Sequence, residues 1–497
     1  MLAFLQRNLP GLICGLAFVS APEANATPTG RPQGTSIPPY IAQRLRDITT
    51  TPRGYINLTR TVSANRAAAK RGIALAGPAG APRIAGQKAI PVLMATFSGT
   101  TGEPFPIANL QRELFNGPWP TGTMTDYYRE ISYSAFTVTG TVHPWKKLDN
   151  TADFYAGTPV PGVGMCNGLC DTAQTGQFLK DVLDKYGDQI DWTQYDNDGP
   201  DGIPNSGDDN GFVDFVAFVH PGIGGECQGV PNNNNIWSHR ATYSGWFGGL
   251  NYETKSKGKN GQNIRINDYV IMPALACDGT TMIQIGVFAH EFGHAFGLPD
   301  LYDTRDANGE SEGIGNWGLM GAGSWGGDNE TPERPSHMSA WEKDRLGWVD
   351  PTEVTSDRDV ELRPVETHPD VIRIKISTDE YYLVEYRRKT GFDVSLHGSG
   401  LLIWRINDSV VQAGMTSNAV NADETKKGVG LIEADGLGEL DQNRNRGNAG
   451  DMFPSGGKRK FDSTTTPASE GLVAICDIGN PGPTIKFKVR VSSNTCN

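Results

Sequence analysis

Residues 290–300, which read His-Glu-Phe-Gly-His-Ala-Phe-Gly-Leu-Pro-Asp, constrain the fold of this chain more than any other stretch. Residues four apart lie on one face of a helix, so the imidazoles of His290 and His294 can bind one metal ion while Glu291 lies beside them. Apolar residues recur between 283 and 296 at mostly four-residue spacings. This spacing predicts a helix with one buried face.

The end of this helix places a third ligand within reach. Gly297 can adopt the left-handed conformation that closes a helix, and Pro299 cannot continue one. We expect the resulting turn to bring the Asp300 carboxylate back toward the two histidines. Two nitrogens and one carboxylate oxygen leave a tetrahedral position open for water, as in catalytic zinc sites. The motif therefore predicts a zinc ion on these three side chains with Glu291 as general base. A histidine pair with only a packing role is the alternative, and the fixed offsets of Gly297 and Asp300 argue against it.

The first 26 residues have the pattern of a secretory signal peptide. A basic start precedes an apolar run at residues 12–19, and the small residues Ala24 and Ala26 precede a cleavage point. Beyond this segment no apolar run approaches the roughly 20 residues that span a bilayer. We therefore expect a secreted, extracellular protein without a membrane anchor.

Residues 27–87 are strongly basic, whereas the chain as a whole has a formal net charge of −12. They hold nine Arg or Lys against one acid, Asp47. Such a segment can dock on an acidic body by charge complementarity, which favours a propeptide that keeps an enzyme inactive. In a propeptide Asp47 is a candidate to cover the zinc ion. A basic, disordered linker is the alternative.

Six cysteines follow the signal segment, an even number that suits disulfide bonds in an oxidising compartment. Six cysteines allow 15 pairings, and the sequence does not choose among them. Proximity along the chain favours Cys166 with Cys170, Cys227 with Cys277, and Cys476 with Cys496.

The chain divides into an α+β part and a β-rich part. We expect a catalytic domain over residues 88–350, with strands at 90–97, 136–142, 212–220 and 268–273, and helices at 109–115, 125–131, 172–186 and 335–348. Short strands at 360–376, 381–387, 401–406 and 484–491 predict an all-β domain over residues 351–497.

An acidic run at residues 191–214 is punctuated by glycines. Carboxylate oxygens are hard ligands that calcium prefers, and glycines permit turns that direct several of them at one ion. The run lacks the glutamate that ends an EF-hand loop, and a solvated acidic loop is the alternative. The candidate calcium ligands are Asp196, Asp198, Asp201, Asp208 and Asp214. For a second acidic group, at Asp435, Asp441 and Asp451, an ordinary loop is the favoured interpretation.

Residues 316–325 form a glycine-rich turn centred on Met320. A thioether is flexible and polarisable, so Met320 is a candidate to pack beneath a metal-bound imidazole. A methionine that only fills the core is the alternative.

Taken together, these stretches resemble the immune inhibitor A family of secreted metallopeptidases, in the metzincin group. The resemblance covers roughly residues 90–460 and rests on residues 126–136, 287–304, 317–325, 381–386, 400–406 and 450–454. It implies a zincin-like fold with a mixed sheet and two long helices, zinc on His290, His294 and Asp300, Glu291 as base and Met320 as the turn methionine. The acidic run departs from the family pattern because residues 200–207 interrupt it. No tyrosine closely follows Met320 to act as a transition-state donor.

The sequence thus predicts a secreted zinc-dependent endopeptidase that acts on protein or peptide substrates, requires Zn²⁺, binds Ca²⁺, and has no nucleic-acid partner. A calcium-stabilised secreted binding or surface protein with a secondary zinc site is the alternative. The presence of Glu291 favours the enzyme, because a binding module has no need of a base beside its metal ligands.

Overall fold

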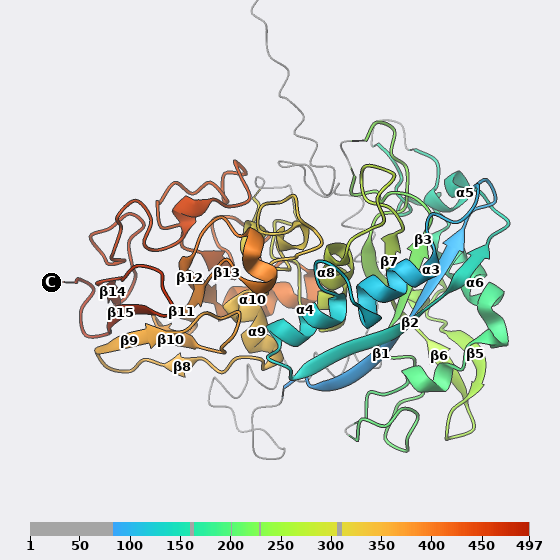
Figure 1. Ribbon diagram of the computed structural model, residues 1–497, viewed down its shortest axis with the longest axis horizontal. Coiled ribbons are helices and arrows are strands. Elements are labelled where there is room, and N and C mark those ends of the chain that lie inside the picture. The colour runs from blue at the N-terminus through green and yellow to red at the C-terminus, as the bar shows by residue number, and fades with distance from the viewer. Residues whose placement is uncertain (1–82, 160–163, 200, 228–229, 306–310, 497) are drawn as a thin grey trace, which may run out of the picture.

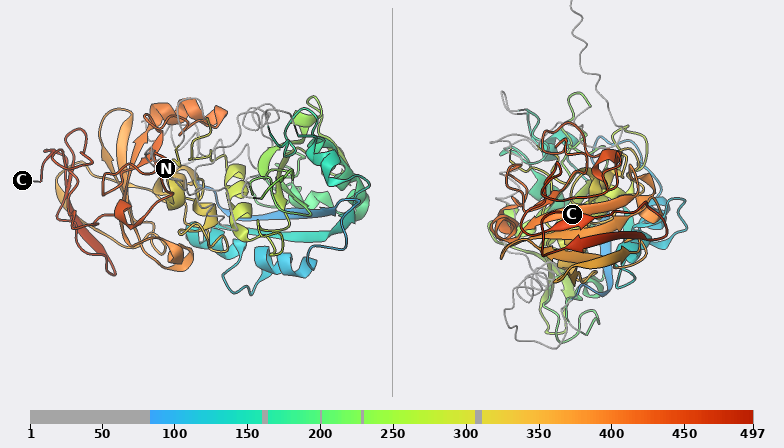
Figure 2. Two further views of the ribbon diagram at one scale, coloured as in Figure 1. Left: turned by 90° about the horizontal axis from the view of Figure 1, so that it is seen from above. Right: turned by 90° about the vertical axis from the view of Figure 1, so that its left-hand side faces the viewer.

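The computed structural model describes residues 83–496 apart from 160–163, 200, 228–229 and 306–310. The predicted signal peptide and most of the basic segment, Asp47 included, lie outside the described residues. The described chain is elongated (Figures 1 and 2), with the α+β part at one end and the β-rich part at the other. This mixed α+β composition agrees with the prediction.

A five-stranded mixed sheet organises the α+β part. Its strand order is β2-β1-β3-β7-β4. The first four strands are parallel to their neighbours, and β4 pairs antiparallel with β7 at the edge. The strands are β1 (Gly86–Thr96), β2 (Phe136–Lys147), β3 (Val216–His220), β4 (His239–Thr242) and β7 (Asp268–Pro273), with a separate hairpin of β5 (Tyr252–Lys257) and β6 (Asn263–Ile266).

Helices cover both faces of this sheet (Figure 1). Alternate side chains of β1 point to opposite faces, so Val92 packs with one cluster while Leu93 packs with another. The first cluster contains the buried faces of α4 and α8, and the second contains α6. The helices are α3 (Ile107–Gln111), continued by a π-helical turn (Arg112–Asn116), then α4 (Met124–Ile131), α5 (Ala152–Ala156), α6 (Thr175–Tyr186), α7 (Tyr243–Trp246), α8 (Ile285–Ala295), α9 (Ala340–Leu346) and α10 (Asp408–Gly414).

Two sheets form the β-rich part. One has the order β13-β12-β11-β10-β8 and the other the order β14-β15-β9, and a shared apolar core lies between them. Residues 360–376, predicted to hold short strand structure, contribute to two strands, because a turn held by the Arg363–Asp370 ion pair divides this range between the two sheets. The strands are β8 (Thr352–Glu353), β9 (Arg358–Leu362), β10 (Val371–Lys375), β11 (Glu380–Arg387), β12 (Gly400–Asn407), β13 (Val429–Leu431), β14 (Ala474–Cys476) and β15 (Ile485–Arg490).

The two parts share one core. Leu383, Leu402 and Trp404, from β11 and β12, belong to the same buried cluster as Phe288 and Phe292 of α8. Burying apolar surface across this junction stabilises the whole arrangement by roughly 25 cal/mol per Å². The β-rich part therefore supports the helix that carries His290 and His294.

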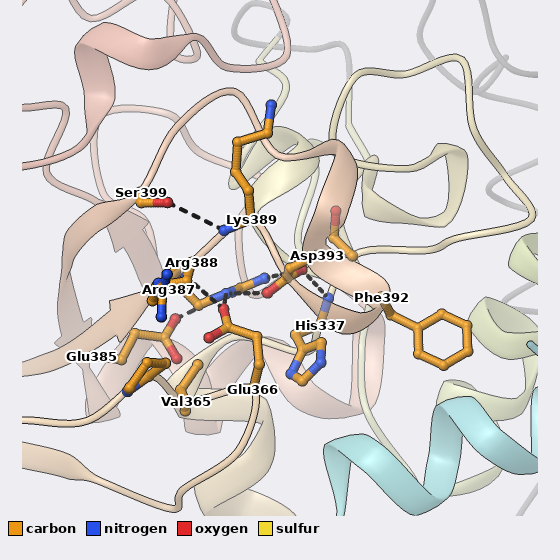
Figure 3. Close-up of polar contacts among 12 residues, drawn as sticks. His337, Val365, Glu366, Glu385, Arg387, Arg388, Lys389, Phe392, Asp393 and Ser399 are labelled. Atoms are coloured by element: carbon orange, nitrogen blue, oxygen red, sulfur yellow. Dashed lines mark hydrogen bonds and ion pairs between the residues drawn. The ribbon is translucent and has the colours of Figure 1, made fainter. Parts of the chain in front are cut away.

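A buried ionic network also lies at this junction (Figure 3). Arg387, at the end of β11, donates to both carboxylate oxygens of Asp393 over 2.6 and 2.7 Å and to the carbonyl of Trp317 over 3.1 Å. Glu385 and Glu366 lie 3.4 and 3.5 Å from its guanidinium. Burial alone acts to raise the pKa of Asp393, but the adjacent cations hold it well below its usual range. One arginine is thus the shared cationic partner of three acids that water does not reach.

All three predicted disulfide bonds are present. They join Cys166 to Cys170, Cys227 to Cys277, and Cys476 to Cys496. None of the helices in the described part of the chain has the length and apolar content that crossing a bilayer requires.

Candidate metal centre

Helix α8 and the turn after it position the predicted ligands. Almost every residue of α8 is buried, so packing on both the sheet and the β-rich part holds the helix in place. Gly297 adopts a φ of 75°, the left-handed conformation expected after a helix end. Its backbone N–H and that of Leu298 bond to the last turn of the helix. The chain therefore reverses, and Asp300 returns to the histidine face as predicted.

Three side chains converge at this point. Oδ1 of Asp300 lies 3.1 Å from Nε2 of His290 and 3.3 Å from Nε2 of His294. One ligand atom of each residue lies within 4.8 Å of the others. Burial acts to raise the pKa of Asp300, but the two imidazoles hold it well below its usual range. The group thus presents an ionised carboxylate to two ring nitrogens.

The hydrogen bonds of the two imidazoles indicate which nitrogens face the centre. Nδ1 of His290 lies 2.9 Å from the carbonyl oxygen of Leu319, and Nδ1 of His294 lies 2.9 Å from that of Leu298. A carbonyl only accepts, so both Nδ1 atoms must donate, and a neutral ring then carries its lone pair on Nε2. Two lone pairs and a carboxylate oxygen facing one point are a donor set that suits a zinc ion.

Glu291 lies beside this group and is only 6% exposed. Its Oε2 has no hydrogen-bond partner among the described residues. Burial, reinforced by the nearby Asp300 and Glu226, raises the pKa of Glu291 to about 8, although His290 opposes the shift. A buried carboxylate with a free oxygen beside a metal centre is suited to accept a proton from water.

A cleft of about 360 Å³ opens onto these residues. One wall comes from the edge strand β4 and the residues before it, including Ser238 and Arg240. The lining also includes residues 415–418, which follow α10 in the β-rich part. The candidate site therefore lies between the two parts of the chain. The three predicted zinc ligands and the predicted general base nevertheless all come from the α+β part.

Met320 lies under α8. It is fully buried, and a Cβ placed on Gly293 would lie only 2.3 Å from its Sδ. The neighbouring Leu319 carbonyl binds His290, and the Met320 N–H donates to Glu342 over 3.0 Å. The turn therefore packs directly against the backbone between the two histidines.

Alanine at Gly293 should destabilise the protein, although alanine normally favours a helix by about 1 kcal/mol over glycine. The added methyl group overlaps Met320, and overpacking of this kind costs about 1–3 kcal/mol. Thermal unfolding of Gly293→Ala would measure the loss, and shortening the opposing side chain in Gly293→Ala/Met320→Ala should relieve the overlap. A Gly293→Ala protein as stable as the parent would contradict this packing.

Asn418 holds the third ligand in place. Its Nδ2 donates to Oδ2 of Asp300 over 2.6 Å, and its Oδ1 accepts from the Asp300 backbone N–H over 2.8 Å. The Asn418 carbonyl accepts from the Thr304 hydroxyl over 2.5 Å. Asn418 adopts a φ of 51°, which asparagine tolerates better than most residues. Sequence reasoning missed this residue because 118 positions separate it from Asp300 and no local motif connects them.

The structure brings together three of the five candidate calcium ligands. Asp196, Asp198 and Asp214 each offer an oxygen within 4.8 Å of the others. Burial first, and nearby carboxylates second, raise the pKa of Asp196 to about 7, and burial raises that of Asp214 to about 8 although Lys88 opposes the shift.

The two remaining candidates, Asp201 and Asp208, lie apart from this group. Both are exposed and accept backbone N–H groups within the loop. Asp209 holds the same loop by accepting from the Gly199 and Ser206 N–H groups.

Part of the chain is similar to known proteins. Residues 114–349 match the family described as immune inhibitor A peptidase M6, catalytic domain. Over 206 residues the chain is 32% identical to immune inhibitor A of Bacillus thuringiensis subsp. alesti, covering 41% of this chain and 29% of that protein. Over 269 residues it is 26% identical to the pre-pro-metalloprotease PrtV of Vibrio cholerae serotype O1 strain M66-2, covering 52% of this chain and 27% of that protein. The chain thus spans less than a third of the length of these relatives.

Proposed function

We propose that this chain, whose residues 114–349 match the catalytic domain of the immune inhibitor A peptidase M6 family, is a secreted zinc-dependent endopeptidase that hydrolyses proteins or peptides. One observation carries the proposal. The donor atoms of His290, His294 and Asp300 converge beside the partnerless oxygen of Glu291, at the floor of a cleft.

Each residue of this centre has a role in the proposed reaction. His290, His294 and Asp300 would hold the zinc ion. A bound zinc ion supplies Lewis acidity, which lowers the pKa of a water molecule and polarises a substrate carbonyl. Glu291 takes a proton from the attacking water and passes it to the amine that leaves. Burial of Glu291 keeps the affinity of its carboxylate for a proton high enough for the first of these steps.

The edge strand of the sheet gives the cleft a means of holding an extended peptide. β4 is the last strand of the five, and the residues before it line the cleft. An edge strand presents backbone N–H and C=O groups that an extended chain can pair with. Binding through the backbone suits an enzyme that cleaves within a polypeptide, because it requires no particular side chain at most positions.

We further propose that residues 88–350 form a zincin-like domain with α8 as its active-site helix and Met320 as the turn methionine, followed by a β-rich C-terminal domain over 351–497. Asp196, Asp198 and Asp214 would bind a calcium ion, and the buried, partnerless Oδ1 of Asp196 supports this assignment. Residues 1–26 would act as a signal peptide and the basic segment that follows as a propeptide or a linker.

Casein hydrolysis by the secreted protein, with and without a zinc chelator, tests the proposal. We expect activity that the chelator abolishes and that added zinc restores. If the protein is inactive, and remains so after removal of residues up to about 88, the endopeptidase proposal fails. A calcium-stabilised binding or surface protein with a secondary zinc site would then be the better interpretation.

Alanine at Asn418 should weaken zinc binding by about 10- to 100-fold, as is typical when a group that orients a metal ligand is removed. The variant loses both hydrogen bonds to Asp300. Competition with a chromogenic chelator measures the affinity independently of catalysis. Ser417→Ala is the matched control, because Ser417 lines the same wall but its hydroxyl bonds only to the Gly414 carbonyl in the described structure. Equal zinc affinity in the two variants would contradict a positioning role for Asn418.

A further inference from the structure

A second group of carboxylates lies in the β-rich part, far along the chain from the acidic run. Glu433, Asp435 and Asp451 each offer an oxygen within 4.8 Å of the others. The group differs from the one seen in the sequence. Asp441, which was grouped with Asp435 and Asp451, instead pairs with Lys427, and Glu433 occupies its place.

Two of these three acids are deeply buried. Asp451 is 1% exposed and Glu433 is 6% exposed, while Asp435 is half-buried. Among the residues that the structure describes, no ion pair joins any of the three to a Lys, Arg or His. Like charges brought this close and removed from water are costly unless a cation or a proton compensates them.

One carboxylate oxygen of Asp451 indicates that this group binds a cation. Oδ2 of Asp451 accepts from Nε1 of Trp317 and from the Asn448 N–H, both over 2.9 Å. Its Oδ1 is equally buried, yet it has no hydrogen-bond partner in the described structure. A buried acceptor left unmatched costs about 1–3 kcal/mol, and more when it is charged. Glu433 and Asp435 each offer an oxygen within 4.8 Å of an oxygen of the same carboxylate.

The surrounding backbone holds the carboxylates in position without neutralising them. Glu433 accepts from the N–H groups of Glu439 and Leu440 over 2.7 and 3.3 Å. Asp435 accepts from the Leu437 N–H over 3.0 Å. A Cβ on Gly450 would lie 2.2 Å from Oδ2 of Asp435, so glycine is needed for this oxygen to approach the chain.

We propose that Glu433, Asp435 and Asp451 bind a calcium ion that fixes residues 433–451 against the turn that carries Met320. The donors are all hard oxygens, which favour calcium over zinc. They come from separate positions on an irregular loop, which suits calcium's flexible coordination better than the strict octahedron of magnesium. This site is distinct from the candidate site at Asp196, and it does not depend on the proposed peptidase activity.

The link to the metal centre follows from three contacts. Asp451 accepts a hydrogen bond from the indole N–H of Trp317, which lies three residues before Met320. The N–H of Asn316 donates to the carbonyl of Arg446 over 2.7 Å, and the Arg446 side chain lies 3.2 Å from Glu312. Arg446 and Glu312 both line the cleft. An ion that holds this loop therefore also holds part of the cleft wall and the floor beneath α8.

Calcium titration of the full-length protein tests the site. The protein would carry Glu291→Gln to prevent self-digestion, be stripped of metals, and be reloaded with one equivalent of zinc. Calorimetry with calcium chloride would then count the bound equivalents, and thermal unfolding would be followed with and without calcium. Asp435→Asn and Asp451→Asn are the test variants. Asp441→Asn is the matched control, since it removes an acid from the same loop but outside the group.

We expect each test variant to bind one calcium equivalent fewer than its parent, or to bind that equivalent at least tenfold more weakly, and to gain less thermal stability from calcium. The Asp441→Asn control should bind as the parent does. Because Asp435 is half-buried, its variant decides the question if Asp451→Asn does not fold. An unchanged number and affinity of calcium ions in Asp435→Asn would overturn the proposal, and so would an equal loss in Asp441→Asn.

Discussion

Glutamine in place of Glu291 is expected to lower the rate of casein hydrolysis by about 10²- to 10⁴-fold, which is the range that a general acid–base residue contributes. Glutamine has nearly the same shape but cannot take a proton from water. It should leave zinc bound, because Glu291 is not among the three converging ligands. Initial rates and zinc content, measured on the same preparation, check both parts of the expectation.

Glu361→Gln provides the matched control for this variant. It makes the same chemical change at an exposed position on β9, in the other part of the chain. Its rate should equal that of the parent. If Glu291→Gln retained full activity with zinc bound, the proposed role of Glu291 would be wrong. If it lost zinc as well as activity, Glu291 would be supporting the metal centre instead.

Leucine in place of Arg387 is expected to destabilise the protein by about 3–5 kcal/mol, as is typical when one partner of a buried ion pair is removed. The change leaves Asp393, Glu366 and Glu385 buried without their shared cation (Figure 3). It also removes the bond to the Trp317 carbonyl. Chemical denaturation followed by fluorescence measures the loss in free energy of unfolding.

An exposed ion pair supplies the control. Arg363 binds Asp370 over 2.8 Å at the surface, so Arg363→Leu should cost only about 0–1 kcal/mol. The loss in Arg387→Leu should also depend on pH. Without the guanidinium, the buried acids should have a pKa above their unfolded values, and stability from such groups is present at low pH and lost as pH rises. The deficit should therefore be smaller at about pH 5 than at about pH 8. Equal losses in the two variants, or a deficit that does not change with pH, would contradict this account of the network.

Features that depend on residues close together in the chain could be predicted from the sequence. The four-residue spacing of His290 and His294 follows from helix geometry, and Gly297 ends the helix because it can adopt a positive φ. Strands β7 and β11 agree with the predicted ranges to within a residue, because continuous apolar runs predict buried strands. The three disulfide bonds each join cysteines that are adjacent among the six in sequence order.

The ends of helices and strands were predicted less well where they depend on residues far along the chain. Helix α9 spans only Ala340–Leu346, shorter than the predicted 335–348, because a capping box of Ser339 and Glu342 starts it late and Gly347 ends it in the left-handed conformation. The edge strand β4 was missed, since a four-residue strand of mixed polarity gives no periodic signal. Its position is set by pairing with β7, which only the folded chain provides.

The sequence by itself determined the groups offered at the centre: two imidazoles, one returning carboxylate and a neighbouring glutamate, all within residues 290–300. Only the tertiary structure decided what surrounds them. It brought Asn418 onto Asp300, replaced Asp441 by Glu433 in the second acidic group, and joined α8 and the β-rich part in one core. The physical reason is the distance along the chain over which each kind of interaction acts. Helix and turn geometry act over a few residues, whereas burial and ion pairing select partners by their position in space after the chain has packed.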